Sequence, residues 1–199
     1  MPRIVLASGS PRRKQLLEEM GFQFLVAPTD ADETVREGAT PEQTAEDLAR
    51  RKAAEACMLW TDALVIAADT VVAVDGQVLG KPADRLDAGR MLRLLRGREH
   101  AVVTGVCLAW QGELISVCER TLVRFDWMTE QDIEDYIATG EPMDKAGAYG
   151  IQGKAGEFIG GISGCYFNVM GLPKAALRKL LVQTVGETGY RALTMIEGE

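Results

Sequence analysis

The sequence of 199 residues has few of the side chains and patterns on which several common enzyme classes depend. It has one histidine, His100, and no GxSxG segment around a serine, so a Ser-His-Asp or Cys-His mechanism is disfavoured. Because His100 begins a predicted strand, we interpret it as structural. The Walker sequence GxxxxGKS/T is also missing from the chain, so a phosphate group would have to be held by a different kind of loop.

Cysteines are few, and their spacing is unlike that of a metal site or a disulfide framework. No CxxC pair occurs among the four, so we expect reduced thiols that are mostly buried as small apolar side chains. Reduced thiols are typical of a cytoplasmic protein. The four residues are Cys57, Cys107, Cys118 and Cys165.

Long hydrophobic runs are missing as well. The apolar run at residues 4–7 is shorter than the core of about 7–15 residues in a signal peptide. The apolar stretch at residues 53–74 contains Glu55, Asp62 and Asp69, whereas a membrane span needs about 20 apolar residues. We therefore expect no export signal and no membrane-spanning helix.

Positive charge is in deficit, because 22 Lys and Arg stand against 29 Asp and Glu, a net charge of −7. A general nucleic-acid binder needs a basic surface, so we expect no nucleic-acid partner, and any anionic ligand must meet a local basic cluster. With 47% hydrophobic and 26% charged residues, the composition is that of an average globular protein. This length predicts one domain, or two closely packed lobes, over residues 1–199.

Hydrophobic periodicity predicts an α/β protein with mixed strands. Residues 40–43, Thr-Pro-Glu-Gln, have the form of a capping box at a helix start, and Asp75-Gly76 is typical of a hairpin turn. Gly97 is placed to end a helix, and the tail after Gly186 is expected to fray. Strands are predicted at residues 4–7, 22–27, 63–74, 77–79, 100–110 and 113–125, and helices at 11–20, 41–58, 84–96, 129–140 and 173–182.

The first candidate site is Ser8-Gly9-Ser10-Pro11-Arg12-Arg13, between the first predicted strand and the first predicted helix. Its glycine and proline shape a turn, and its hydroxyls and the free N–H groups of the helix start would point outward. Two guanidiniums follow, so the segment has the parts of a phosphate site. The plain alternative is an ordinary capped helix with solvated arginines.

The second candidate is Asp69, which interrupts an otherwise apolar strand. Burying an unpaired carboxylate costs several kcal/mol, so Asp69 should lie at the edge of a cleft with a cation, a metal or hydrogen-bond donors. A purely structural buried Asp is the alternative. Glu33 alone would be a solvated surface charge, but together with Asp69 it could hold Mg²⁺ or Mn²⁺, which prefer oxygen ligands.

Scattered lysines and a glycine-rich segment complete the candidates. Lys52, Lys81 and Lys145 would each be a surface lysine if taken alone. In residues 148–153, glycines let the backbone approach a ligand, and Gln152 offers both a donor and an acceptor. The alternative for this segment is a tight loop anchored by its tyrosine.

Taken in order, these motifs resemble the Maf family of nucleoside triphosphate pyrophosphatases, which are related to septum-formation inhibitors. The resemblance covers about residues 4–181. It implies a two-lobed α/β fold of the inosine-triphosphatase type, with an elongated bent mixed sheet, a cleft between the lobes, and a homodimer. The segments that carry it are residues 6–13, 32–33, 48–53, 68–71, 80–82, 144–153, 162–164 and 171–173.

Carried over position by position, the resemblance makes Asp69 the proton acceptor that activates water. It places Glu33, with Asp69, on a divalent metal, Mg²⁺ or Mn²⁺, or on the waters of that metal. Cations around the phosphates would stabilise the charge that builds when water attacks the α–β phosphoanhydride. The positions implied to bind the substrate are Ser8, Arg12, Arg13, Lys52, Thr70, Lys81 and Gln152.

The resemblance also bears on which base is bound. One subgroup of the family acts on dTTP and UTP, and another acts on 7-methyl-GTP, whose base is cationic. Arg12, Thr70 and Gln152 resemble the first subgroup, so we expect a cytoplasmic hydrolase that converts dTTP, UTP and related pyrimidine nucleotides to the monophosphate and pyrophosphate. The alternative is a nucleotide-binding regulator of cell division or septum formation that does not need turnover.

Overall fold

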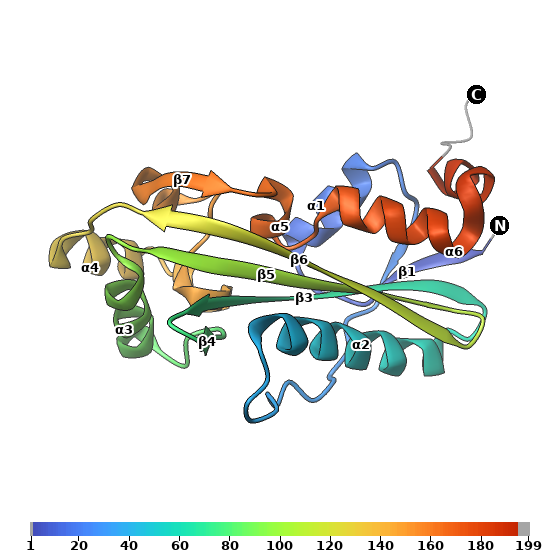
Figure 1. Cartoon of the computed structure of the whole chain (residues 1–199), viewed down its shortest axis with the longest axis horizontal. Helices are drawn as coiled ribbons and strands as arrows, with labels where there is room; N and C mark the ends of the chain where they lie inside the picture. The colour runs from blue at the N-terminus through green and yellow to red at the C-terminus, as the bar shows by residue number, and fades with distance from the viewer. Residues whose placement is uncertain (1, 195–199) are drawn as a thin grey trace.

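The computed structural model describes residues 2–194 and has an elongated shape built on one long mixed sheet (Figure 1). Seven strands form the sheet in the order β2-β1-β3-β5-β6-β7, and β4 pairs with β3 outside this path. The predicted α/β class with mixed strands is confirmed. The strands are β1 (Arg3–Leu6), β2 (Leu25–Val26), β3 (Ala63–Val74), β4 (Gln77–Leu79), β5 (Glu99–Trp110), β6 (Glu113–Phe125) and β7 (Ile159–Ser163).

Helices and short turns of 3₁₀ helix connect these strands. No helix among the described residues is both long and apolar enough to cross a membrane. The α-helices are α1 (Pro11–Glu19), α2 (Pro41–Leu59), α3 (Arg85–Leu95), α4 (Glu130–Ala138), α5 (Tyr166–Met170) and α6 (Lys174–Thr194). The 3₁₀ helices are η1 (Glu141–Asp144), η2 (Ala146–Ala148) and η3 (Lys154–Phe158).

One edge of β3 is covered by two different strands with a gap between them. β5 pairs with β3 over residues 65–73 along the opposite edge. On the edge with the gap, β1 runs parallel to residues 63–66, and β4 runs antiparallel to residues 72–74. Residues 67–71 therefore have no strand partner on this side, which opens the sheet at the position of Asp69.

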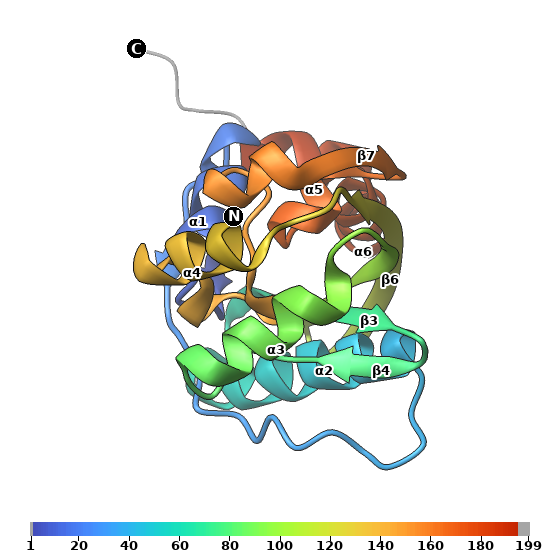
Figure 2. The same cartoon turned by 90° about the vertical axis from the view of Figure 1, so that its left-hand side faces the viewer.

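Helix α2 covers one face of the sheet, and α1, α5 and α6 lie on the opposite face (Figures 1 and 2). The α2 side packs through small residues, including Ala45, Ala49 and Ala53, which are fully buried. Gly105 on β5 permits this close approach, because a Cβ there would lie 2.3 Å from the carbonyl oxygen of Ala45. Gly105 is the partner of Asp69 in the sheet. Helix α2 therefore lies close to the sheet at the position where the Asp69 carboxylate projects.

An apolar cluster lies where α3 and α4 pack against the C-terminal ends of β3 and β6 and the N-terminal end of β5. Leu92 and Leu95 on α3 meet Phe125 on β6 and Tyr136 on α4, and all four side chains are buried. Tyr149, in the glycine-rich segment, belongs to the same cluster. This packing fixes residues 141–153 beside the gap in β3.

Most predicted elements are confirmed. Thr40 and Gln43 form the capping box of α2, and Gly97, with φ +67°, follows the end of α3. Asp75-Gly76 and Gln111-Gly112 form hairpin turns with positive φ at each residue. The strand predicted at residues 63–74 has those bounds in the structure.

Other predictions were wrong. The predicted strand at residues 22–27 is reduced to β2. The chain does not fray after Gly186 within the described residues, because α6 resumes after a kink there and Leu193 packs into the core. Residues 195–199 lie outside the described part. The four cysteines are free as expected, but only Cys107 is buried.

Candidate active site

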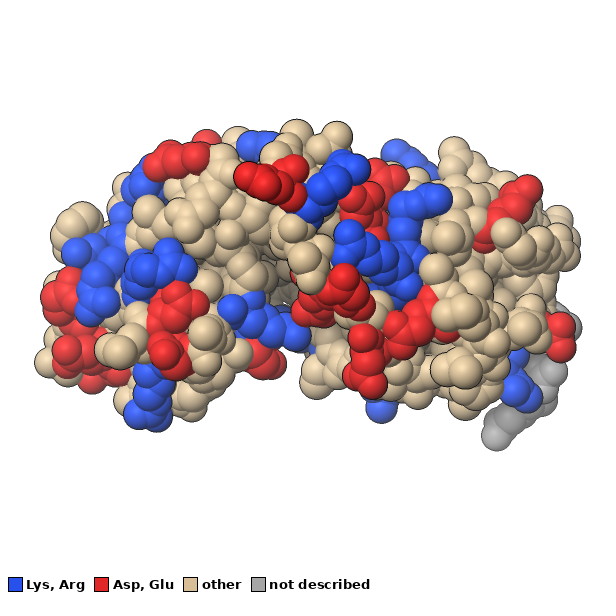
Figure 3. Space-filling view, turned by 90° about the horizontal axis from the view of Figure 1, so that it is seen from below, with Lys and Arg blue, Asp and Glu red and all other residues tan. Residues whose placement is uncertain are grey.

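A cavity of about 780 Å³ lies at the gap in β3, between the two ends of the molecule. The space-filling view from below shows a hollow there with charges of both signs around it (Figure 3). Asp69 and Thr70 are consecutive on one strand and so project to opposite faces of the sheet. Both line the cavity, because the open edge lets it reach both faces.

The predicted phosphate loop forms one wall of the cavity. Ser10 caps α1 through a hydrogen bond from the backbone N–H of Arg13, and Pro11 occupies the first turn. The start of α1 therefore presents free N–H groups and its positive dipole end toward the cavity. Ser8, Gly9 and Arg12 from the same segment also line it.

Arg13 ties three parts of the chain together. Its guanidinium donates to Ser8 Oγ at 3.1 Å, to Thr70 Oγ1 at 3.0 Å and to the carbonyl oxygen of Gly171 at 2.9 Å. Burial lowers the pKa of Arg13, although the charge of Asp69 opposes this shift. The side chain thus holds positive charge at the cavity wall and fixes the loop to β3.

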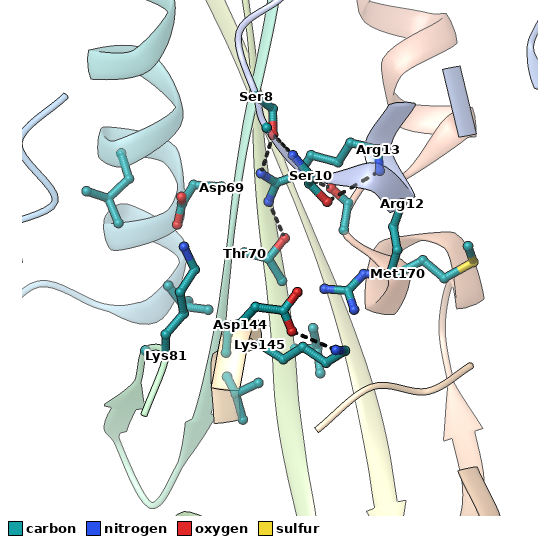
Figure 4. A pocket seen from close by; sticks show the side chains of 18 of the residues that line it. Ser8, Ser10, Arg12, Arg13, Asp69, Thr70, Lys81, Asp144, Lys145 and Met170 are labelled. Atoms are coloured by element: carbon teal, nitrogen blue, oxygen red, sulfur yellow. Dashed lines mark hydrogen bonds and ion pairs between the residues drawn. The ribbon is translucent and has the colours of Figure 1, made fainter. Parts of the chain in front are cut away.

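Asp69 and Glu33 share one ammonium group. Lys52 on α2 places Nζ 2.5 Å from Asp69 Oδ1 and 2.7 Å from Glu33 Oε1. The hydrogen bond from Lys52 lowers the pKa of Glu33, and the charges of Lys52, Lys81 and Arg13 add to this effect. Lys81 reaches toward the Asp69 carboxylate from the β4 side (Figure 4). Of the partners expected beside Asp69, which were a cation, a metal or hydrogen-bond donors, the structure shows a cation, Lys52.

Two carboxylates offer a place for a divalent cation. No group of three or more His, Cys, Asp or Glu side chains within residues 2–194 is arranged to hold a metal ion. Mg²⁺ commonly binds through one or two carboxylates and completes its shell with water and substrate phosphates. Glu33 and Asp69 therefore fit a cation that arrives together with a phosphate chain.

A third group of charges faces this site from residues 144–145. Lys145 donates to the carbonyl oxygen of Glu141 and to Asp144 Oδ1, both at 2.7 Å. Burial acts to raise the pKa of Asp144, but the hydrogen bond from Lys145 and the charges of Lys145 and Arg12 outweigh it and lower that pKa. Asp144, Lys145 and Arg12 all line the cavity.

The glycine-rich segment is anchored next to this group. The N–H of Gly147, a residue with φ +68°, bonds the carbonyl oxygen of Gly80 at 3.0 Å and so links the segment to the loop that carries Lys81. Tyr149 lies 2.7 Å from His100, from hydroxyl oxygen to Nε2. Gln152 is exposed and does not line the cavity.

The structure brings together eight of the nine residues to which the resemblance gives a catalytic, metal-binding or substrate-binding role, and the further candidate Lys145 lines the same cavity. Gln152 is the residue that it leaves outside the cavity. Sequence reasoning did not single out Asp144, although its position beside Lys145 and just before a glycine-rich segment was a usable signal. The eight residues are Ser8, Arg12, Arg13, Glu33, Lys52, Asp69, Thr70 and Lys81.

Comparison with known proteins gives consistent matches over nearly the whole chain. The family model described as Maf-like protein matches residues 3–184. A dTTP/UTP pyrophosphatase of Pelotomaculum thermopropionicum is 51% identical over 183 residues, which cover 91% of this chain and 96% of the relative. A dTTP/UTP pyrophosphatase of Thermococcus gammatolerans is 50% identical over 191 residues, covering 96% and 99%.

Proposed function

The chain belongs to the Maf-like protein family, and we propose that it hydrolyses dTTP, UTP and related pyrimidine nucleotides, modified ones included, to the monophosphate and pyrophosphate. The relatives named dTTP/UTP pyrophosphatase support the substrate class. The observation that carries the proposal is the Asp69 carboxylate at the open edge of β3, opposite the positive end of α1 and among cationic side chains. Such a cavity matches a polyphosphate that must be attacked by water.

Asp69 accepts the proton of the attacking water. Lys52 donates to Oδ1, so Oδ2 is left to accept this proton as the water oxygen bonds to phosphorus and the α–β phosphoanhydride breaks. The electron pair of the broken bond leaves with the pyrophosphate group. Lys52 and Lys81 neutralise the charge that builds on the phosphate oxygens.

Ser8, Thr70 and Arg13 hold the phosphate wall in place. Arg13 bonds both hydroxyls, and the Thr70 hydroxyl also lies 2.9 Å from that of Thr104. The wall is therefore built before substrate enters, which lowers the cost of ordering it during the reaction.

Glu33 and Asp69 would hold the Mg²⁺ or Mn²⁺ that the proposed reaction needs. When bound, the divalent cation would supply charge stabilisation for the phosphate oxygens. Removal of divalent cations with a chelator is expected to abolish turnover, and adding Mg²⁺ or Mn²⁺ is expected to restore it.

We also propose a cytoplasmic homodimer. The free cysteines are typical of a reducing compartment. The exposed side chains of Ile162, on the edge strand β7, and of Tyr166 and Phe167, on α5, offer an apolar surface to a second copy. Light scattering of the purified protein tests the dimer, and a monomer at micromolar concentration would contradict it.

Product analysis tests the proposed reaction. The purified protein with Mg²⁺ or Mn²⁺ is expected to convert dTTP to dTMP and pyrophosphate, as separated by ion-exchange chromatography. Formation of dTDP and orthophosphate would show attack at the terminal phosphate and would contradict the proposal.

A further inference from the structure

Three charged side chains meet on the cavity wall away from the catalytic carboxylates. Figure 4 shows Asp144 with the ammonium of Lys145 on one of its oxygens and the guanidinium of Arg12 facing the other. The effect of Arg12 on the pKa of Asp144 agrees with this closeness. No hydrogen bond or ion pair joins Arg12 to Asp144 or to any other residue of the described chain, and its buried Nε lacks a partner.

The cluster keeps hydrogen-bonding capacity that the protein does not use. An ammonium has three donors, and Lys145 uses two of them on Glu141 and Asp144, so one remains. A carboxylate accepts several hydrogen bonds, and the side chain of Asp144 is 71% exposed. Together, Arg12, Asp144 and Lys145 offer a donor, an acceptor and a donor side by side.

This order of groups matches one kind of base edge. Uracil and thymine present a carbonyl oxygen, an N–H and a second carbonyl oxygen, which is the complementary order of acceptor, donor and acceptor. We propose that Asp144 determines base specificity by accepting the N3–H of uracil or thymine, with Arg12 and Lys145 donating to the flanking carbonyls. The inference rests on the proposed function, and it assigns the base to the wall formed by residues 12 and 144–145.

The same array rejects other bases. Cytosine has an unprotonated N3, so its lone pair would face the Asp144 carboxylate, and its amino group would face a cation. Adenine has the same mismatch at N1 and its amino group, and guanine presents an amino group where a carbonyl is required. A site built to hydrogen-bond a substrate group discriminates strongly against an analogue that leaves its polar groups unpaired.

The test compares Asp144→Asn with the matched variant Asp135→Asn. Asp135 is an exposed carboxylate on α4 in the same end of the molecule, and its hydrogen bond is with Gln131 on the same helix. Binding of the α,β-methylene analogues of UTP and CTP is measured by calorimetry with Mg²⁺, so no turnover is needed. Pyrophosphate release from UTP and CTP is measured separately.

We expect the wild-type protein and Asp135→Asn to prefer the uridine analogue by at least about tenfold, and Asp144→Asn to lose most of this preference. An unchanged ratio in Asp144→Asn overturns the inference, and so does an equal loss of affinity for both analogues, which indicates a structural role. Absence of pyrophosphate release by the wild-type protein contradicts the proposed function instead, and the binding ratio still decides the role of Asp144.

Discussion

Lys52 and Asp69 form an ion pair with 2.5 Å between Nζ and Oδ1, and the helix and strand that carry them come close because a glycine on the neighbouring strand β5 lets α2 pack tightly on the sheet. Gly105 is the sheet partner of Asp69, and α2 rests directly on it. Both side chains of the ion pair are nearly buried, with 13% and 12% exposure. The charge arrangement of the site thus depends on backbone packing one strand away.

Asp69→Asn tests the carboxylate as the base. The amide keeps the shape of the side chain but cannot accept the proton, so turnover is expected to fall by about 10²–10⁴. Lys52 keeps Glu33 as a partner, so the protein should still fold. Steady-state kinetics and thermal unfolding are measured together, and turnover near the wild-type value would refute the assignment.

The buried side chain of His100 is expected to make the free energy of unfolding depend on pH. Burial lowers the pKa of His100 to about 4, and its ring contacts Tyr149 and Phe125. Between about pH 6.5 and 4 the unfolded chain binds a proton at this histidine and the folded chain does not, so stability falls as pH falls through this range. The contribution amounts to about 3 kcal/mol over the whole range.

Urea unfolding at several pH values between 7 and 4.5 measures this effect. His100→Asn removes the titrating group, so the free energy of unfolding should fall less steeply with decreasing pH than in the wild-type protein. Carboxylates contribute to both curves, and the difference between the curves isolates His100. Parallel curves would show that the folded protein binds the proton as readily as the unfolded chain.

Most helices and strands could be predicted from the sequence because the patterns that specify them involve residues close together in the chain. The apolar run of β3, the capping box of α2 and the turn at Asp75-Gly76 each depend on neighbouring residues. β7 and α5 were missed because tertiary contacts hold them. Asn168 on α5 donates to the carbonyl oxygen of Val102 and to Thr121, both distant in sequence.

Some residues of the candidate site could also be identified from local sequence, and others could not. An acidic residue inside an apolar strand marked Asp69 without any structure, and the loop before α1 was marked by its own residues. The meeting of Arg12 with Asp144 could not be predicted, because it depends on how η1 and the glycine-rich segment pack against Tyr136 of α4. The predicted contact of Gln152 with the base stays a prediction.

Gly105→Ala tests the link between packing and the site. The added Cβ would lie 2.3 Å from the backbone of Ala45, so α2 must shift and carry Lys52 away from Asp69. We expect a loss of about 1–3 kcal/mol in stability, together with lower kcat. Gly161→Ala on β7 is the matched control, because its Cβ would meet nothing closer than 3.8 Å. Equal behaviour of the two variants would contradict the role of Gly105.

Gln152→Ala distinguishes recognition of the base by Gln152 from recognition by Arg12, Asp144 and Lys145. The side chain of Gln152 is exposed and lies outside the cavity lining, whereas Arg12, Asp144 and Lys145 line it. With the segment in this position, kcat/KM for UTP and for CTP should each change less than about twofold, because no contact to the base is lost. A selective loss of about tenfold for UTP would instead indicate that Gln152 contacts the base and that residues 150–153 move toward the cavity when the substrate binds.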